Sequence, residues 1–201
     1  MTIDDLVDRL PRLRLEAGSV LDRSRLVDVT LIVVHEGLVL VRTPVTGSAR
    51  RTITCYAGAG SFVLPPGEEE LLTALTDATV VPISMDDREG LIASPEAARL
   101  LVDGLAETLR QKHGAIASMS RPHHVDRVRE KLIELAREHG RVGRDGIRLD
   151  FPLTHDLLGE MVGSARETVT RALDELQREG FVVRRGRTYS VRLEPEQLAS
   201  F

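Results

Sequence analysis

Residues 12–85 alternate short apolar segments with clusters of turn-forming residues. Apolar runs at 29–34 and 38–41 flank His35-Glu36-Gly37, which predicts a β-hairpin. Further β-rich segments lie at 51–56 and 78–84, and clusters of glycine, proline and serine separate the runs. Such short strands with closely spaced turns predict a small antiparallel β-barrel or sandwich.

The spacing of apolar residues changes at Ser94-Pro95-Glu96, which combines an N-cap serine, a first-turn proline and an acid. Apolar residues then follow at helical spacing, which predicts an amphipathic helix of about 25 residues; they include Leu101, Leu105, Leu109, Ile116 and Met119. This stripe has two interpretations. It packs on the β-domain, or it forms the seam of a parallel dimer.

Pro122 ends this helix, and a second amphipathic helix is predicted at 124–138, before Gly140. A polar loop follows at 141–150, with a short strand possible at 147–151. The expected organisation is a β-barrel domain at 1–93, a dimerisation helix at 94–120 and a third domain at 121–201. The fold class is α+β.

A short helix, a turn and a longer helix follow at 153–179. Thr154 is the predicted N-cap of the short helix and Gly163 its end. Ser164-Ala165-Arg166-Glu167 then matches a capping box, which predicts that Ser164 caps the second helix. One face of that helix is apolar, and it consists of Val169, Ala172, Leu173 and Leu176.

This arrangement is typical of a helix-turn-helix, whose second helix offers its first residues to base edges in the major groove. Arg166, Glu167 and Arg171 are the candidate base readers, because arginine donates twice to guanine and glutamate accepts from cytosine. Thr170 lies on the same helix and is a candidate DNA-backbone contact. The two-fold symmetry that such DNA readers usually need favours the dimer interpretation of the helix from Ser94.

Two β-rich runs at 181–183 and 189–191 flank a basic turn, which predicts a hairpin or wing. Arg184, Arg185 and Arg187 at its tip are candidate phosphate contacts.

The net charge of −4 hides a division along the chain. Residues 1–120 hold 12 basic and 17 acidic residues, and residues 121–201 hold 15 and 14. Seven arginines and four acids lie at 164–192, which gives this segment the positive bias that phosphate binding needs.

The remaining composition excludes several classes of protein. No stretch is long and apolar enough to span a membrane, so we expect a cytoplasmic protein without membrane contact. The single cysteine, Cys55, excludes an intramolecular disulfide and a multi-cysteine metal site. The six histidines lack the spacing of a catalytic metal site, and no nucleophile or nucleotide-binding motif is present, so an enzyme is not expected.

Over 153–176 the sequence resembles the family of the cyclic-AMP receptor protein and the fumarate-nitrate regulator. The resemblance rests on Leu153-Thr154, Val162-Gly163, Arg166-Glu167-Thr168-Val169 and Arg171-Ala172-Leu173. It implies an N-terminal effector barrel of the cyclic-nucleotide-binding or cupin-like type, a dimerisation helix and a C-terminal winged helix-turn-helix. It also implies a homodimer that binds a palindromic operator in double-stranded DNA, with RNA polymerase as a candidate partner. By position, Thr154, Ser164 and Thr168 fall where DNA-backbone contacts are expected.

The sequence departs from this family at the effector site. Family members that bind cyclic AMP carry an arginine for the phosphate, whereas this chain has no arginine at 52–87 and three acids at 68–70. Classical cyclic-AMP binding is therefore not expected, and the cofactor and effector are unknown. Three possibilities stay open: a haem or redox sensor that uses a histidine or Cys55, a barrel that serves only dimerisation, and a different small-molecule effector.

Overall fold

The computed structural model describes residues 10–119, 121–186 and 188–193, with the side chains of 115, 118 and 119 left out. The chain divides into two compact units between Gly114 and Ala115. No helix in the described ranges is long and apolar enough to cross a lipid bilayer.

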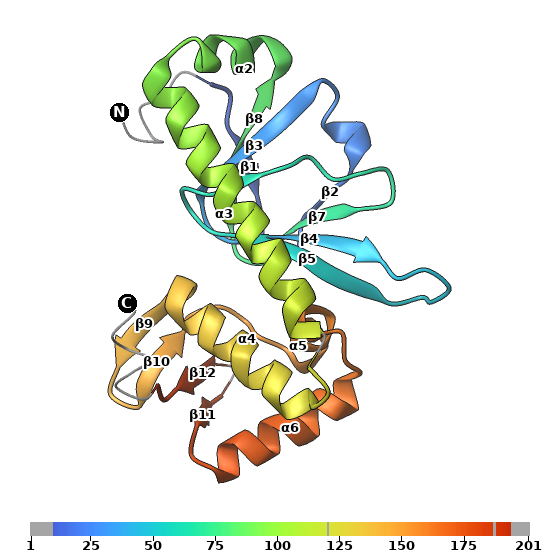
Figure 1. Cartoon of the computed structure of the whole chain (residues 1–201), viewed down its shortest axis with the longest axis vertical. Coiled ribbons are helices and arrows are strands. Elements are labelled where there is room, and N and C mark those ends of the chain that lie inside the picture. Colours follow the sequence, from blue (N-terminus) through green and yellow to red (C-terminus); the bar gives the residue numbers. More distant parts are fainter. Residues whose placement is uncertain (1–9, 120, 187, 194–201) are drawn as a thin grey trace. The chain divides into compact units, whose positions relative to one another are not determined.

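The first unit is built from two four-stranded antiparallel sheets (Figure 1). One sheet has the strand order β1-β8-β3-β6 and the other β2-β7-β4-β5. The strands are β1 (Leu13–Leu15), β2 (Val20–Leu21), β3 (Val29–Glu36), β4 (Val39–Pro44), β5 (Arg51–Ala57), β6 (Phe62–Val63), β7 (Leu71–Ala74) and β8 (Ala78–Ser84), with the 3-10 helix η1 (Arg23–Arg25) between β2 and β3. The predicted α+β class and small antiparallel β-domain are confirmed, although the sheets do not close into a hydrogen-bonded barrel within the described residues. The hairpin predicted around His35-Glu36-Gly37 is wrong, because β3 and β4 lie in different sheets and do not pair with each other.

Apolar side chains fill both sides of the first sheet. One cluster includes Leu21, Ile32, Val41 and Leu72, so the two sheets contribute to one shared core. A second cluster joins alternate residues of β3 and β8, such as Val33 and Val81, to the helices that follow. Because both faces of β3 and β8 are buried in this way, the sequences of the two strands are apolar at nearly every position.

Helix α2 (Met85–Ile92) was absent from the sequence-based prediction. Its start is a true capping box: Ser84 Oγ accepts from the Asp87 amide at 3.2 Å, and the Asp87 carboxylate accepts from the Ser84 amide at 3.2 Å. The helix has no buried residue and no amphipathic stripe, so periodicity could not reveal it.

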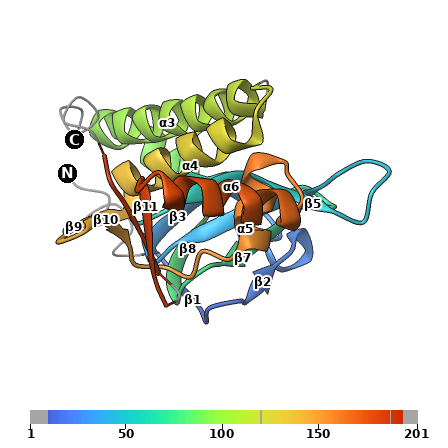
Figure 2. The same cartoon turned by 90° about the horizontal axis from the view of Figure 1, so that it is seen from below.

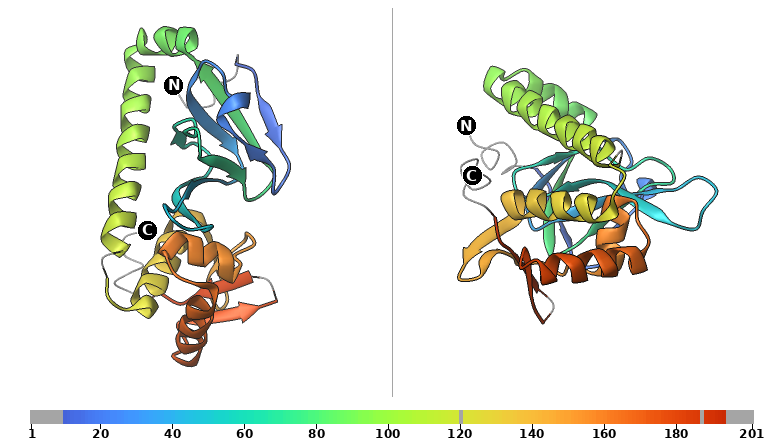
Figure 3. Two further views of the ribbon diagram at one scale, coloured as in Figure 1. Left: turned by 90° about the vertical axis from the view of Figure 1, so that its right-hand side faces the viewer. Right: turned by 60° about the horizontal axis from the view of Figure 1, so that its bottom comes forward.

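Helix α3 (Pro95–Met119) is the predicted long helix (Figure 3). Its first turns pack on the β1-β8-β3-β6 sheet, where Ala97 and Leu101 are buried against Phe62. Leu101 was expected in the dimer seam, and this is corrected: only 6% of its surface is exposed because it belongs to the unit's own core. By contrast, Val102, Leu105, Leu109 and Ile116 are between 40% and 65% exposed. The side chain of Met119 lies outside the described ones.

Gly104 marks the closest approach of α3 to the sheet. A Cβ built there would lie 2.0 Å from Cδ2 of Phe62, whose ring is fully buried and cannot turn away. We therefore expect Gly104→Ala to destabilise the protein by at least about 1 kcal/mol, as overpacking of a core does. Thermal unfolding checks this. The control is Gly114→Ala on the same helix, where nothing lies within 4 Å and alanine should instead stabilise slightly; equal effects at the two positions would contradict the packing.

The second unit contains three helices and a four-stranded sheet (Figure 2). The helices are α4 (His124–His139), α5 (His155–Val162) and α6 (Arg166–Arg178), and the strands are β9 (Gly140–Gly143), β10 (Gly146–Leu149), β11 (Val182–Arg185) and β12 (Thr188–Val191), in the sheet order β11-β12-β10-β9. Their common core includes Leu132, Leu149, Leu158 and Leu173, each at most 1% exposed. The polar loop predicted at 141–150 is in fact the β9–β10 hairpin, in which Gly146 has a φ of 119°. Its second strand, β10, overlaps the short strand predicted at 147–151.

Candidate DNA-binding surface

Helix α5 begins and ends as its sequence predicts. The Thr154 hydroxyl oxygen accepts from the Leu157 amide at 3.1 Å, and Gly163 ends the helix in the left-handed conformation, with φ 63° and ψ 35°. Gly159 lies against the turn, because a Cβ there would be 2.7 Å from the Ser164 carbonyl oxygen. The close approach of α5 to the turn therefore depends on a glycine at 159.

The predicted capping box at Ser164 is wrong. The N-cap of α6 is Ala165, which makes no side-chain cap, and Ser164 is 3% exposed. Its hydroxyl instead lies 2.8 Å from Nδ1 of His124, so it ties the start of α4 to the turn. This burial removes the Ser164 hydroxyl from the expected DNA-backbone contacts.

The recognition-type helix α6 has one buried face and one exposed face. Val169, Ala172, Leu173 and Leu176 are at most 2% exposed, as their spacing predicts. Arg166, Glu167 and Arg171 are exposed on its first two turns, which are the part of such a helix that reaches base edges.

Two exposed arginines of this surface, Arg166 and Arg185, have acidic neighbours that DNA could replace. Arg166 Nη1 lies 3.6 Å from Oδ2 of Asp156, and both side chains are 64% exposed. Arg185 at the wing pairs similarly with Asp145. Because exposed ion pairs are worth roughly 0–1 kcal/mol, these arginines can exchange a carboxylate for a phosphate or a base at little cost.

The wing is the β11–β12 hairpin, which turns at Gly186 with a φ of 61°. Arg184 and Arg185 lie exposed beside this turn, and Arg187 lies outside the described residues. The Arg184 guanidinium is 5.8 Å from the centre of the Tyr189 ring, and its Nε donates to the Gly186 carbonyl at 3.1 Å. These two contacts hold the positive charge of Arg184 beside the turn of the wing.

A concave pocket of about 390 Å³ lies where α5, α6 and the wing meet. Its lining includes Thr154, His155, Arg166, Arg184 and Tyr189. The Arg184 guanidinium and the amino-terminal end of α5 favour an anion at this place, whereas Arg166 is paired with Asp156, which also lines the pocket. A DNA phosphate has the required charge.

The three threonines of the expected backbone contacts differ in their surroundings. Thr154 is exposed, and its capping oxygen leaves the hydroxyl hydrogen able to donate to a phosphate. Thr168 is half-buried. Thr170 is also half-buried and donates to the Arg166 carbonyl at 2.9 Å, so its hydroxyl is already engaged within the helix.

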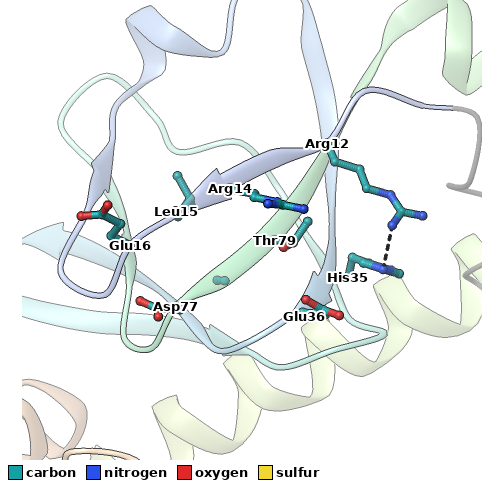
Figure 4. A pocket seen from close by; sticks show the side chains of 9 residues that line it. Arg12, Arg14, Leu15, Glu16, His35, Glu36, Asp77 and Thr79 are labelled. Carbon is teal, nitrogen blue, oxygen red and sulfur yellow. Dashed lines mark hydrogen bonds between the residues drawn. The ribbon is translucent and has the colours of Figure 1, made fainter.

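In the first unit, an open pocket of about 530 Å³ lies on the β1-β8-β3 surface (Figure 4). Arg12 points toward His35, and its guanidinium donates to Nε2 at 3.1 Å. Arg14 and Thr79 lie between this pair and the acidic side chains of Glu16 and Asp77. Within the described residues no group of three histidine, cysteine or acidic side chains could hold a metal ion.

Three histidines of the second unit have lowered pKa values, and burial is the largest cause in each case. The groups are His124, His139 and His155, and nearby arginines add to the effect at His124 and His155. Their pKa values in the unfolded chain are about 6.5, so the unfolded chain takes up protons first as pH falls.

Stability should consequently be full above about pH 6.5 and decline as pH falls through the lowered pKa values of these histidines. We expect the Tm of the full chain to be lower at pH 5.5 than at pH 7.5. His139→Gln should reduce the acid-induced loss. A Tm that is unchanged or higher at pH 5.5 would show that these histidines are not held neutral by the fold.

Comparisons with known proteins agree with this geometry. Residues 126–201 match the family model of the Crp-like helix-turn-helix domain. The transcriptional regulator SdrP of Thermus thermophilus is 30% identical over 157 residues, which cover 74% of this chain and 72% of that protein. The global nitrogen regulator of Synechococcus elongatus is 34% identical over 97 residues, covering 48% of this chain and 43% of its own length. The chain thus spans less than half of that relative.

Solved structures share the fold over nearly the whole chain. A CooA mutant from Carboxydothermus hydrogenoformans has a TM-score of 0.78 at 18% identity, covering 98% of this chain and 89% of that one. TTHA1359 of Thermus thermophilus, a transcriptional regulator of the CRP/FNR family, has a TM-score of 0.71 at 23% identity, covering 94% and 97%. The curated relatives named above are transcription regulators and not enzymes.

Proposed function

Because this chain belongs to the Crp/Fnr family of transcription regulators, we propose that it binds a palindromic DNA operator as a homodimer, without a need for cyclic AMP. The observation that carries the proposal is the exposed first half of α6 with Arg166, Glu167 and Arg171, beside the arginines of the wing. Base edges and phosphates are what these side chains recognise in combination.

The residues divide into two roles. Arg166, Glu167 and Arg171 read bases, whereas Arg184, Arg185 and Arg187 hold phosphates and set the register. The anion pocket at the start of α5 receives one phosphate, to which Thr154 donates, and Thr168 and Thr170 border the same backbone. These residues belong to a DNA-binding domain at 121–201.

Helix α3 supplies the dimer seam of the proposed homodimer, within a dimerisation segment at 94–120. Val102, Leu105, Leu109, Lys112 and Ile116 follow one another at steps of three, four, three and four residues. This is the heptad spacing of a coiled coil, and its four apolar members are exposed in the single chain. Val102 takes the place that the sequence-based interpretation gave to Leu101.

The domain at 1–93 is proposed as an effector-type module that does not take cyclic AMP. At the acidic segment, one Glu70 oxygen accepts from the Gly67 amide at 2.9 Å and the other accepts from the Thr43 hydroxyl at 2.8 Å. A carboxylate therefore already uses the donors of this loop, and it would repel a cyclic phosphate. RNA polymerase is a further proposed partner, to which no residue is assigned.

The test of DNA binding is a titration of the full chain, without added ligand, against a labelled random-sequence duplex. Three wing arginines on each of two protomers make six phosphate contacts, so log K should fall with log salt with a slope of about −5. No binding at 50 mM salt, or binding insensitive to salt, would contradict the proposal.

A further inference from the structure

A chain of three hydrogen bonds crosses the second unit at its candidate DNA-binding surface. His155, the first residue of α5, lies between Thr170 on α6 and Tyr189 on β12. Its Nδ1 is 2.8 Å from the Thr170 hydroxyl and its Nε2 is 3.0 Å from the Tyr189 hydroxyl. Thr170 in turn donates to the Arg166 carbonyl at 2.9 Å.

The positions of the hydrogens follow from the donors and acceptors present. Thr170 has one hydroxyl hydrogen, and the Arg166 carbonyl takes it, so Nδ1 must carry a hydrogen that Thr170 accepts. A neutral imidazole then leaves Nε2 as an acceptor. Tyr189 is 2% exposed, and its hydroxyl donates to Nε2, which avoids the cost of an unsatisfied buried donor. The hydroxyl hydrogens of Thr170 and Tyr189 and the ring hydrogen of His155 all find acceptors only when His155 is neutral and carries its hydrogen on Nδ1.

This chain connects the two elements that the proposed function needs. Thr170 and the Arg166 carbonyl belong to the first turns of α6, which carry the base readers. Tyr189 lies under the guanidinium of Arg184 on the wing. One imidazole therefore links Thr170 of the reading helix to Tyr189 of the wing by hydrogen bonds.

We propose that neutral His155 is a positioning residue for sequence reading, which holds α6 and the wing in the register that a specific operator requires. The proposal rests on the proposed function, in which DNA is read by α6 and held by the wing. His155 lines the anion pocket at the start of α5, but both of its ring nitrogens are engaged by Thr170 and Tyr189, so in this role it contacts neither base nor phosphate.

The charges that surround His155 come from every packed element. Arg166 and Asp174 belong to α6, Asp156 to α5, and Arg184 to β11, while the phenol of Tyr189 faces it from β12. Burial first, and then the two arginines, lower the pKa of His155, and the two aspartates oppose this. A proton added at low pH would lie on Nε2, against the Tyr189 hydroxyl hydrogen.

The experiment combines a readout without DNA and one with DNA. Nitrogen-15 NMR of the free full chain reports the tautomer of His155, for which we expect Nδ1–H. Binding is then measured on the duplex that the wild-type chain selects and on a random duplex, for the wild type, His155→Ala, His155→Asn and Tyr189→Phe.

We expect His155→Ala and Tyr189→Phe to lower the ratio of specific to random affinity by about 3- to 10-fold, while random binding stays near wild type. His155→Asn keeps a donor near the place of Nδ1 and should restore part of the ratio. In the wild type the ratio should also fall once the pH drops below the lowered pKa of His155, and it should fall less in His155→Asn. Tyr189→Phe keeps the ring in the core, so it remains informative if His155→Ala does not fold.

Other outcomes would overturn the proposal. An Nε2–H tautomer, or an imidazolium at pH 7.5, would contradict the hydrogen-bond direction whatever the DNA results. A wild-type affinity that rises equally for both duplexes at low pH would mean that charged His155 binds phosphate directly. An Nδ1–H tautomer in a chain that selects no sequence would instead refute the proposed function, and the positioning role with it.

Discussion

Replacing Leu109 with glutamate is expected to convert the proposed dimer to a monomer and to weaken operator binding by about 100-fold or more. Leu109 lies at the middle of the exposed heptad stripe of α3 and is itself 54% exposed. A carboxylate there would face its own copy across a two-fold seam, where two like charges cannot be desolvated together. A monomer would then bind one half-site only and would lose the affinity that a linked second DNA-binding domain adds at the other half-site.

Sedimentation of the full chain and operator binding at matched salt measure the two effects. The control is Arg110→Glu, which adds the same carboxylate at the neighbouring, exposed position outside the stripe and should leave the dimer intact. A monomeric wild type, or a Leu109→Glu variant that stays dimeric, would contradict the proposal that α3 forms the dimer interface.

Replacing Arg171 with alanine should weaken binding to the specific operator by about 1–3 kcal/mol and relax the preference at one base pair. The reason is that Arg171 is exposed on the second turn of α6, and a guanidinium can donate to O6 and N7 of one guanine. Random DNA should lose little affinity, because its binding depends on phosphate contacts.

Arg185→Ala is the matched control for Arg171→Ala. It removes the same charge from the wing, so it should weaken specific and random duplexes alike and reduce the salt slope by about 1 per protomer. Binding of each variant to both duplexes over a series of salt concentrations makes the comparison. Equal losses for the two variants on both duplexes would mean that the assigned roles are wrong.

The sequence was most informative where local chemistry determines the structure. The strand at 78–84, the helix from Ser94 and the Thr154 and Gly163 boundaries of α5 follow from apolar spacing and from capping residues, and the structure confirms them. The exposed and buried faces of α6 were predictable for the same reason. Each depends on contacts within a few residues.

Capping signals were ambiguous because two serines fit the same pattern. Ser84 makes the box, whereas Ser164 turns its hydroxyl into the core toward His124. The difference is a tertiary contact 40 residues away in sequence, which the local pattern does not contain. The burial of Leu101 has a similar cause, because only the packing of α3 on Phe62 decides which side of the helix is covered.

The contacts of His155 and Tyr189 could not be found from the sequence. The two residues lie 34 positions apart in the sequence, and their side chains meet only when the wing folds back on α5. A polar residue directly after an N-cap threonine is usually a solvated first-turn residue, so nothing local indicated a bridging role. A useful signal would have been the tyrosine in a short wing strand whose other residues, Thr188, Ser190 and Val191, are all small.

The most direct test of the central claim is selection of bound sites by the full chain, without ligand, from a pool of random duplexes, followed by sequencing. The account predicts enriched inverted repeats whose half-sites lie about one helical turn, roughly 34 Å, apart. Enrichment of single half-sites, or no enrichment under conditions where random duplexes are bound, would contradict a homodimer that reads its operator without an effector.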